Sequence, residues 1–239
     1  MRAHPRVLPA LAIALLAGSL LAGCVASPAS VEELARPEQQ RVLHGELVRE
    51  MLAQDRNHAA LAHLQELERQ RGRLDDDQRL LRAEAFYRLR EYGSAEKDYQ
   101  VLTRSSLAGQ AWHGLGRLHT PSDLRAALQA FNEAVAARPT DPAVRNDLGY
   151  ALLLAGRVED ACRQLYTAHE LAPQQQRVVG NLLLCEALRN DLAARERLFQ
   201  VHGFTSAERE RHQRDVVQLQ WEIQRRRHEL LPPPSENPS

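Results

Sequence analysis

Aromatic side chains make up only 5% of this 239-residue sequence, and Gly and Pro number 12 each. Long runs of Val, Ile and Thr, which β-strands favour, are also missing. Basic and acidic residues number 31 each, so no net charge attracts nucleic acid or an acidic substrate. Ala, Leu, Arg, Glu and Gln dominate instead, and all five are good helix formers. The composition therefore predicts an all-α protein that does not bind nucleic acid.

Motifs of catalysis and metal binding are missing as well. The sequence has no His-Glu-x-x-His, no phosphate-binding Gly-rich loop and no Gly-x-Ser-x-Gly turn. Its 10 histidines are scattered at spacings unsuited to a shared metal ion, so we interpret them as solvated surface residues. We expect no enzymatic activity, no metal and no cofactor.

Two clusters of charged residues can be interpreted either as binding sites or as ordinary structural features of helices. Residues Asp75–Asp77 could bind a cation, but carboxylates also favour the first turn of a helix, and we interpret them as a helix start. Residues Arg225–Arg227 could contact anionic lipid headgroups. We interpret them as the solvated face of a helix near its C-terminus, where cations are favoured.

The N-terminus has the form of a secretory signal. Arg2 and Arg6 precede a mostly apolar run from Val7 to Leu21. A run of this length is shorter than the ~20 residues that a helix needs to cross a bilayer, and it fits the hydrophobic region of a signal peptide. The run ends in Leu21-Ala22-Gly23-Cys24, which resembles the lipobox of bacterial lipoproteins.

The lipobox resemblance implies diacylglyceryl transfer to Cys24, cleavage before it, and N-acylation of the new terminus. Residues 1–23 are then the signal peptide, and residues 24–37 are a lipidated N-terminus and flexible tether. A single myristoyl chain binds a membrane only marginally, whereas the three chains of the lipoprotein family imply permanent attachment. Val25, in place of Asp, implies sorting to the periplasmic face of the outer membrane. An ordinary cleaved signal is the alternative.

A repeat of about 34 residues organises the rest of the chain, most clearly at 109–141 and 142–175. Four pairs of positions recur at this spacing: Ala127 and Ala161, Phe131 and Leu165, Ala134 and Ala168, and Pro139 and Pro173. Leu-Gly pairs lie upstream of both sets, and Trp112 precedes the first pair by three residues. The pattern resembles the tetratricopeptide repeat. This resemblance implies a superhelical solenoid of helical hairpins.

Small residues in this pattern allow close helix approach. We expect Gly149 to face Ala161 across one hairpin, with Phe131 and Leu165 filling the space beside the small residues. Asp141 and Pro142 should be the N-cap and first residue of a helix.

Weaker copies extend the predicted repeats over 38–203. Their matching positions are Ala60, Leu64, Leu67, Ala83, Phe86, Ala95, Tyr99, Leu102, Leu182, Leu183, Leu188, Leu192 and Phe199. Ordinary amphipathic helices are the alternative for these outer units. Thr205 and Glu208 form a predicted capping box that opens a C-terminal capping helix over 204–231, which shields the last apolar face. Residues 232–239 should be disordered.

The first helices of such hairpins line a concave groove that binds a peptide or a partner's helix. The predicted groove positions are His113, Arg117, Asn146, Tyr150 and Leu153. Asn and Arg can bind a peptide backbone, and Tyr150 can stack on a side chain. That these are merely exposed helix residues is the alternative. We expect a protein or peptide partner for the groove as a whole.

Cys162 and Cys185 are predicted on neighbouring helices of successive units. Export implies an oxidising compartment, in which a disulfide between them is one interpretation. Two small buried thiols are the default interpretation, because bridging requires Cα atoms within about 7 Å.

The whole architecture resembles the TadD lipoproteins of the tight-adherence (Flp) pilus assembly system. The match rests on Leu21-Ala22-Gly23-Cys24, the segment 146–157 and the stretch 181–184. It implies a pilotin or scaffold that helps the pilus secretin or other components assemble, with no catalytic residues. A scaffold for another envelope system, such as a type IV pilus pilotin or an adaptor for peptidoglycan hydrolases, is the alternative. A second alternative is an enzyme fused to tetratricopeptide repeats.

Overall fold

The computed structural model describes residues 28–230, and the burial of side chains over residues 38–227. The predicted signal peptide, Cys24 and the 232–239 tail lie outside the described residues. The described chain forms 11 α-helices and contains no strand, which confirms the all-α tetratricopeptide solenoid. None of the described helices combines the length and apolar character needed to cross a membrane.

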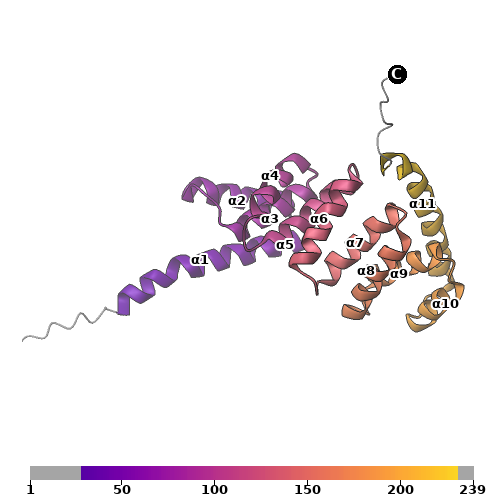
Figure 1. The fold of residues 1–239 in the computed structure, drawn as a ribbon. Coiled ribbons are helices and arrows are strands. Elements are labelled where there is room, and N and C mark those ends of the chain that lie inside the picture. The colour runs from indigo at the N-terminus through magenta and orange to yellow at the C-terminus, as the bar shows by residue number, and fades with distance from the viewer. Residues whose placement is uncertain (1–27, 231–239) are drawn as a thin grey trace, which may run out of the picture. The chain divides into compact units, whose positions relative to one another are not determined.

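The helices follow one another with short connections (Figure 1). In chain order they are α1 (Pro28–Ala53), α2 (Asn57–Arg71), α3 (Asp76–Arg88), α4 (Tyr92–Leu102), α5 (Ala108–His119), α6 (Leu124–Ala137), α7 (Pro142–Leu154), α8 (Val158–Leu171), α9 (Gln176–Leu188), α10 (Leu192–Val201) and α11 (Ser206–Leu230).

The chain divides into two units, residues 1–42 and residues 43–239. In the first unit the structure describes the beginning of α1, where Glu38 and Arg41 form an ion pair one turn apart. Helix α1 starts at Pro28, so residues 28–37 are helical and the flexible tether predicted over 24–37 is wrong for them. Pro is tolerated at the first position of a helix, and the run Glu32–Ala35 consists of good helix formers.

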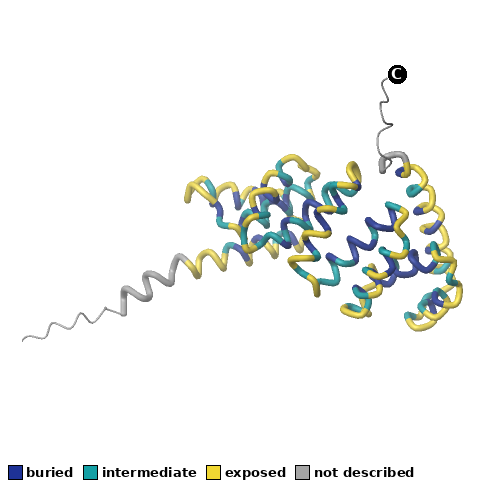
Figure 2. Tube along the Cα trace, viewed as in Figure 1, coloured by how far each residue is buried: buried dark blue, intermediate teal, exposed yellow. Residues whose placement is uncertain are grey.

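The second unit is a series of helical hairpins. Residues Val48 and Leu52 of α1 pack on Ala60 and Leu64 of α2 in the first apolar cluster. Helices α3 and α4, α5 and α6, α7 and α8, and α9 and α10 then form successive antiparallel pairs, each contacting the next. Helices α7 and α9 carry the longest buried runs, shown in dark blue in Figure 2.

Close helix approach occurs where the repeat pattern places glycine. A Cβ atom on Gly149 would lie 2.6 Å from Cγ of Leu165 and 3.3 Å from the carbonyl oxygen of Ala161. A Cβ atom on Gly116 would lie 2.5 Å from Cδ1 of Phe131. These contacts confirm the predicted packing, in which glycine makes room for the large residue of the facing helix.

Helix starts also follow the sequence signals. The Asp141 carboxylate accepts hydrogen bonds from the N–H groups of Ala143 and Val144, at 2.8 and 3.2 Å, with Pro142 at the first helical position. Asp75 caps α3 in a capping box with Gln78, which confirms the acidic cluster as a helix start. Glu208 accepts a hydrogen bond of 2.8 Å from the backbone N–H of Thr205, as the capping box predicts.

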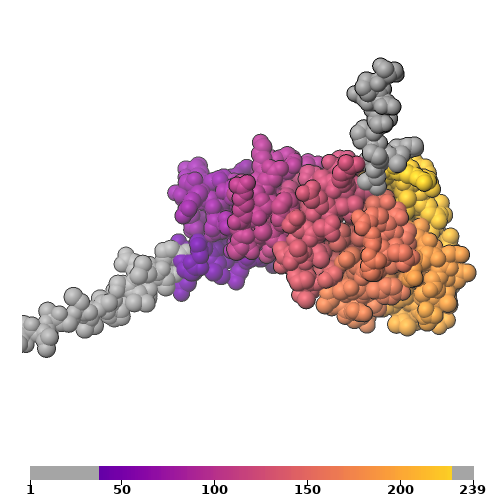
Figure 3. Space-filling model, in the orientation of Figure 1, coloured from indigo at the N-terminus to yellow at the C-terminus, as the bar shows by residue number. Residues whose placement is uncertain are grey.

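Helix α11 covers more than the last hairpin. It packs against α9 and α7, and also contacts α6. Val216 and Leu219 of α11 belong to the same apolar cluster as Leu152 of α7 and Leu184 of α9. Figure 3 shows the yellow and orange surface of α10 and α11 continuing that of the repeats. The C-terminal helix is thus an integral part of the core.

Candidate protein-binding groove

The first helices of three successive hairpins are linked by charged side chains. Nε2 of His113 on α5 lies 2.9 Å from Oδ2 of Asp147 on α7. Arg177 on α9 forms an ion pair of 2.8 Å with Oδ1 of the same carboxylate. Burial alone would raise the pKa of Asp147, but His113 and Arg177 together hold it below its ordinary value. His113 and Asp147 lie 34 residues apart, at equivalent positions of successive repeats, and Arg177 lies one helical turn before the next equivalent position, residue 181. Together the three side chains form one wall.

Asparagine side chains continue this wall. Nδ2 of Asn181 on α9 donates a hydrogen bond of 2.9 Å to Oδ1 of Asn146 on α7. Nδ2 of Asn146 in turn donates to Oδ1 of Asp147 at 3.0 Å. Asn146 is buried, so its amide orients its neighbours rather than meeting solvent.

A separate ion pair joins the first helices of the two preceding hairpins, α3 and α5. Nη1 of Arg117 on α5 lies 3.2 Å from Oε2 of Glu84 on α3. The guanidinium also lies 4.2 Å above the ring of Tyr87, a cation–π contact. Burial alone would raise the pKa of Glu84, but the charges of Arg117 and Arg88 lower it.

The structure therefore separates the five predicted groove residues. Tyr150 lines an open pocket, and His113 and Asn146 belong to the polar wall that reaches it through Arg177 and Asn181. Arg117 does not line this pocket and pairs with Glu84 one repeat earlier. Leu153 is fully buried in the main apolar cluster, so its prediction as a groove residue is wrong. Helix α7 is covered by α8, α9, α6 and α11, which leaves little of its circumference exposed.

The open pocket of about 1020 Å³ lies between α7, α9 and α11. Tyr150 and Leu154 of α7 and Asn181 of α9 line it from the repeats, and Asp215 and Trp221 line it from α11. The sequence predicted only the repeat side of this groove. It contained no signal that α11 would supply the opposite wall, because a capping box marks where a helix begins and not what it packs against.

Arg226 fixes the far end of α11. Its Nη1 and Nη2 donate to the carbonyl oxygens of Thr120 and Pro121, at 2.8 and 3.3 Å, in the turn between α5 and α6. Only 5% of Arg226 is exposed, so the interpretation of 225–227 as a solvated face is wrong for this residue. The turn offers two carbonyl oxygens that α5 and α6 leave without helical partners.

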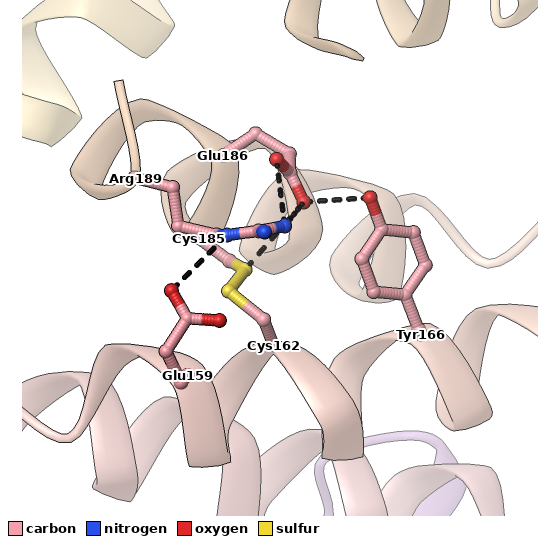
Figure 4. Close-up of a disulfide and its surroundings, with 6 residues drawn as sticks. All are labelled: Glu159, Cys162, Tyr166, Cys185, Glu186 and Arg189. Atoms are coloured by element: carbon pink, nitrogen blue, oxygen red, sulfur yellow. Dashed lines mark hydrogen bonds and ion pairs between the residues drawn. A yellow bond between two sulfur atoms is a disulfide. The ribbon is translucent and has the colours of Figure 1, made fainter. Parts of the chain in front are cut away.

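A disulfide joins Cys162 of α8 to Cys185 of α9, with Cα atoms 5.6 Å apart (Figure 4). The default interpretation of two free thiols is therefore wrong. Next to the bridge, the buried Glu186 carboxylate accepts a hydrogen bond of 2.7 Å from the Tyr166 hydroxyl. Burial and this hydrogen bond raise the pKa of Tyr166 to about 12. In the described part of the chain, Cys162, Cys185 and Glu186 form the one cluster of metal-ligand side chains, but its sulfur atoms are already bonded to each other.

Several histidines are not the solvated residues that the sequence suggested. Ring nitrogens of His44 and His63 lie 3.0 Å apart, and those of His169 and His202 lie 3.2 Å apart. His212 on α11 is only 5% exposed and its ring packs edge-on against Phe199. Helix packing brings these rings together across large sequence separations, which spacing along one helix could not predict.

No family model matches the chain. A curated relative from Pseudomonas aeruginosa, the TPR repeat-containing protein PA4299, is 35% identical over 192 residues, which cover 77% of this chain and 75% of the relative. Among solved structures, the thermophilic TPR protein TTC0263 of Thermus thermophilus is similar, with a TM-score of 0.58 and 14% identity over 76% of this chain and 99% of that one.

A second similar structure is YrrB, described as a TPR protein with an unusual peptide-binding site. Its TM-score is 0.50, with 15% identity over 73% of this chain and 91% of YrrB. Both structures share the stacked helical hairpins described above. The repeat glycines make their predicted contacts, and the alignment with PA4299 covers three quarters of that relative. The chain therefore belongs to the family of tetratricopeptide-repeat proteins.

Proposed function

We propose that this protein is a scaffold that binds proteins through the groove between its repeats and α11. The observation that supports this most directly is the open pocket of about 1020 Å³, which joins the polar wall of α7 and α9 to α11. Tetratricopeptide proteins are generally scaffolds rather than enzymes, and YrrB, which shares the fold, has a peptide-binding site.

We further propose that the scaffold is anchored by lipid at Cys24 to the periplasmic face of the outer membrane. The support is Leu21-Ala22-Gly23-Cys24 after a positively charged start and a short apolar run. A disulfide between Cys162 and Cys185 is compatible with an oxidising compartment outside the cytoplasm.

The system that it serves is, in this proposal, the Flp pilus secretion machine. Its role there is that of a pilotin or scaffold that helps the secretin or another assembly component. The basis is the resemblance of the lipobox and repeats to the TadD lipoproteins.

Deletion of the gene tests this assignment. We expect fewer surface pili and fewer heat-resistant secretin multimers on gels, both restored by the wild-type gene. Normal fibres and multimers in the deletion strain would contradict the pilus role. Such a result would favour a scaffold of another envelope system, for example a type IV pilus pilotin or an adaptor for peptidoglycan hydrolases.

The anchor has a separate test in Cys24→Ser. We expect the variant to move from the membrane fraction to the soluble fraction, or to keep its signal peptide, since serine cannot take up the lipid. A Cys162→Ser/Cys185→Ser variant is the control, because it also replaces cysteines by serines but keeps Cys24. Unchanged membrane attachment of Cys24→Ser would contradict the anchor.

A further inference from the structure

Gly180 is a glycine that the fold itself does not require. It lies inside α9, where glycine weakens a helix because it has the largest conformational entropy to lose. A Cβ atom on Gly114, Gly116 or Gly149 would lie 2.4 to 2.6 Å from a side chain of the facing helix. A Cβ atom on Gly180 would meet no other atom within 4 Å, and Gly180 lines the pocket between α9 and α11. Its bare backbone therefore borders open space in that pocket.

Trp221 is a second residue outside the apolar core, and in the described part of the chain its ring makes a cation–π contact with Arg225, whose Cζ lies 5.7 Å from the ring centroid. It is 64% exposed, although the same helix buries His212, Val216 and Leu219. The Trp221 side chain lines the same pocket as Gly180, from the opposite wall. Tryptophan is enriched among residues that dominate protein–protein binding. A helix glycine without a packing reason and an exposed tryptophan thus border one cavity.

The polar groups of the pocket match a peptide backbone. Four side-chain amides line it, those of Gln174, Gln176, Asn181 and Gln218. Within the described part of the chain, the three glutamine amides make no hydrogen bond, and Asn181 makes a single one to Asn146. Each amide offers both a donor and an acceptor, as each peptide unit does.

The charges of the pocket do not select a charged ligand. Three arginines and three carboxylates line it: Arg177, Arg211, Arg226, Glu208, Asp215 and Glu222. Several of them are already neutralised, since Arg226 pairs with Glu222 and Arg177 pairs with Asp147. A ligand with a large net charge would gain little here and would lose its hydration.

We infer that this pocket binds an extended peptide segment without net charge that carries a large apolar side chain. The apolar side chain packs against Trp221, the peptide backbone passes close over Gly180, and the amides of Asn181 and the glutamines bind its N–H and C=O groups. An extended segment exposes these groups, whereas a helix has already paired them internally. The inference rests on the proposed protein-binding role and names the chemistry of the partner.

The test uses the full chain purified in detergent and a phage-displayed library of random 12-residue peptides. Peptides that are recovered are synthesised and titrated against the wild type, Gly180→Leu and Trp221→Ala. Gly93→Leu is the matched control, because a Cβ atom there also meets no atom within 4 Å but Gly93 lies outside the pocket. Thermal unfolding followed by circular dichroism checks that all variants fold.

We expect the recovered peptides to be apolar and without net charge. Their affinity should fall by about tenfold or more in Gly180→Leu and in Trp221→Ala, and stay unchanged in Gly93→Leu. Because Trp112 and Trp221 are the two tryptophans of the chain, Trp112→Phe isolates the emission of Trp221, which should shift when a peptide binds.

Recovery of no peptide, recovery of strongly charged peptides, or equal affinity for the wild type and both pocket variants would each overturn the inference. The pilus role and the peptide-binding pocket can be rejected independently of each other. A deletion strain without pili, combined with peptides insensitive to Gly180→Leu, would reject the pocket alone. A deletion strain with normal pili, combined with peptides sensitive to Gly180→Leu, would reject the pilus role alone.

Discussion

Oδ2 of Asp147 lies 2.9 Å from Nε2 of His113, one repeat earlier in the chain. Asp147 is 5% exposed and also pairs with Arg177, whose side chain remains 65% exposed. One carboxylate therefore links the first helices of three successive hairpins, and its role in stability should differ from that of its exposed partner.

Asp147→Ala should lower the free energy of unfolding by about 1–3 kcal/mol, because it leaves the buried amide of Asn146 and the ring of His113 without their acceptor. Arg177→Ala should cost less than about 1 kcal/mol, because water solvates and screens the largely exposed guanidinium of Arg177. Denaturation by urea measures both values. Equal losses in the two variants would show that the carboxylate does not organise the wall.

Gly149→Ala and Gly180→Ala should change stability in opposite directions. The new methyl group at residue 149 would lie 2.6 Å from Cγ of Leu165, and overpacking of this kind costs about 1–3 kcal/mol. At residue 180 the methyl group enters open space, so the better helix propensity of alanine should stabilise the protein by about 1 kcal/mol. Urea denaturation measures the free energy of unfolding of both variants. A lower value for Gly180→Ala than for the wild type would contradict the prediction and would show that Gly180 has a packing role.

The disulfide between Cys162 and Cys185 closes a loop with a sequence separation of 23. Cys162→Ala/Cys185→Ala should lower the free energy of unfolding by about 3 kcal/mol, because the unfolded chain regains the entropy that the bridge removes. Urea denaturation of the variant and the wild type, both without reductant, measures the difference in their free energies of unfolding. Peptide mapping by mass spectrometry is the control, and free thiols at both positions in the unreduced protein would contradict the bridge.

Stability should also fall when the pH drops below about 6.5. Burial first, and then the charge of Arg195, lower the pKa of His212, while Asp215 and a backbone hydrogen bond at Leu183 oppose the shift. A histidine with a lowered folded-state pKa binds a proton more readily when unfolded. Its contribution is therefore complete above the unfolded pKa and is lost as the pH falls toward the folded pKa.

His212→Gln removes this titration. We expect the difference in melting temperature between pH 7.5 and 5.5 to be smaller in the variant than in the wild type, whatever the variant does to stability at pH 7.5. His58→Gln is the control, because His58 is exposed at the start of α2. An unchanged pH dependence in His212→Gln would assign the effect to other histidines, such as His44 and His169, whose pKa values burial also lowers.

Local pattern was enough to predict the fold and its hairpins. The spacing of Gly149, Ala161 and Leu165 specifies which residues meet inside a hairpin, since both helices of the pair are close in sequence. Caps such as Asp141 are equally local, because the side chain bonds backbone groups within three residues. The exposure of Leu153 was predicted wrongly. The helical period shows which residues share one face of α7, but not how many other helices pack against that face.

The sequence by itself determined the helices and the repeat, which depend on residues within about one repeat of each other. Only the tertiary structure decided the site: α11 reaches back so that Arg226 binds the carbonyl oxygen of Thr120, 106 residues earlier, and Trp221 comes to border the same pocket as Gly180. The physical reason is that the docking of α11 depends on the shape and free carbonyl groups of a surface that exists only after the hairpins have stacked.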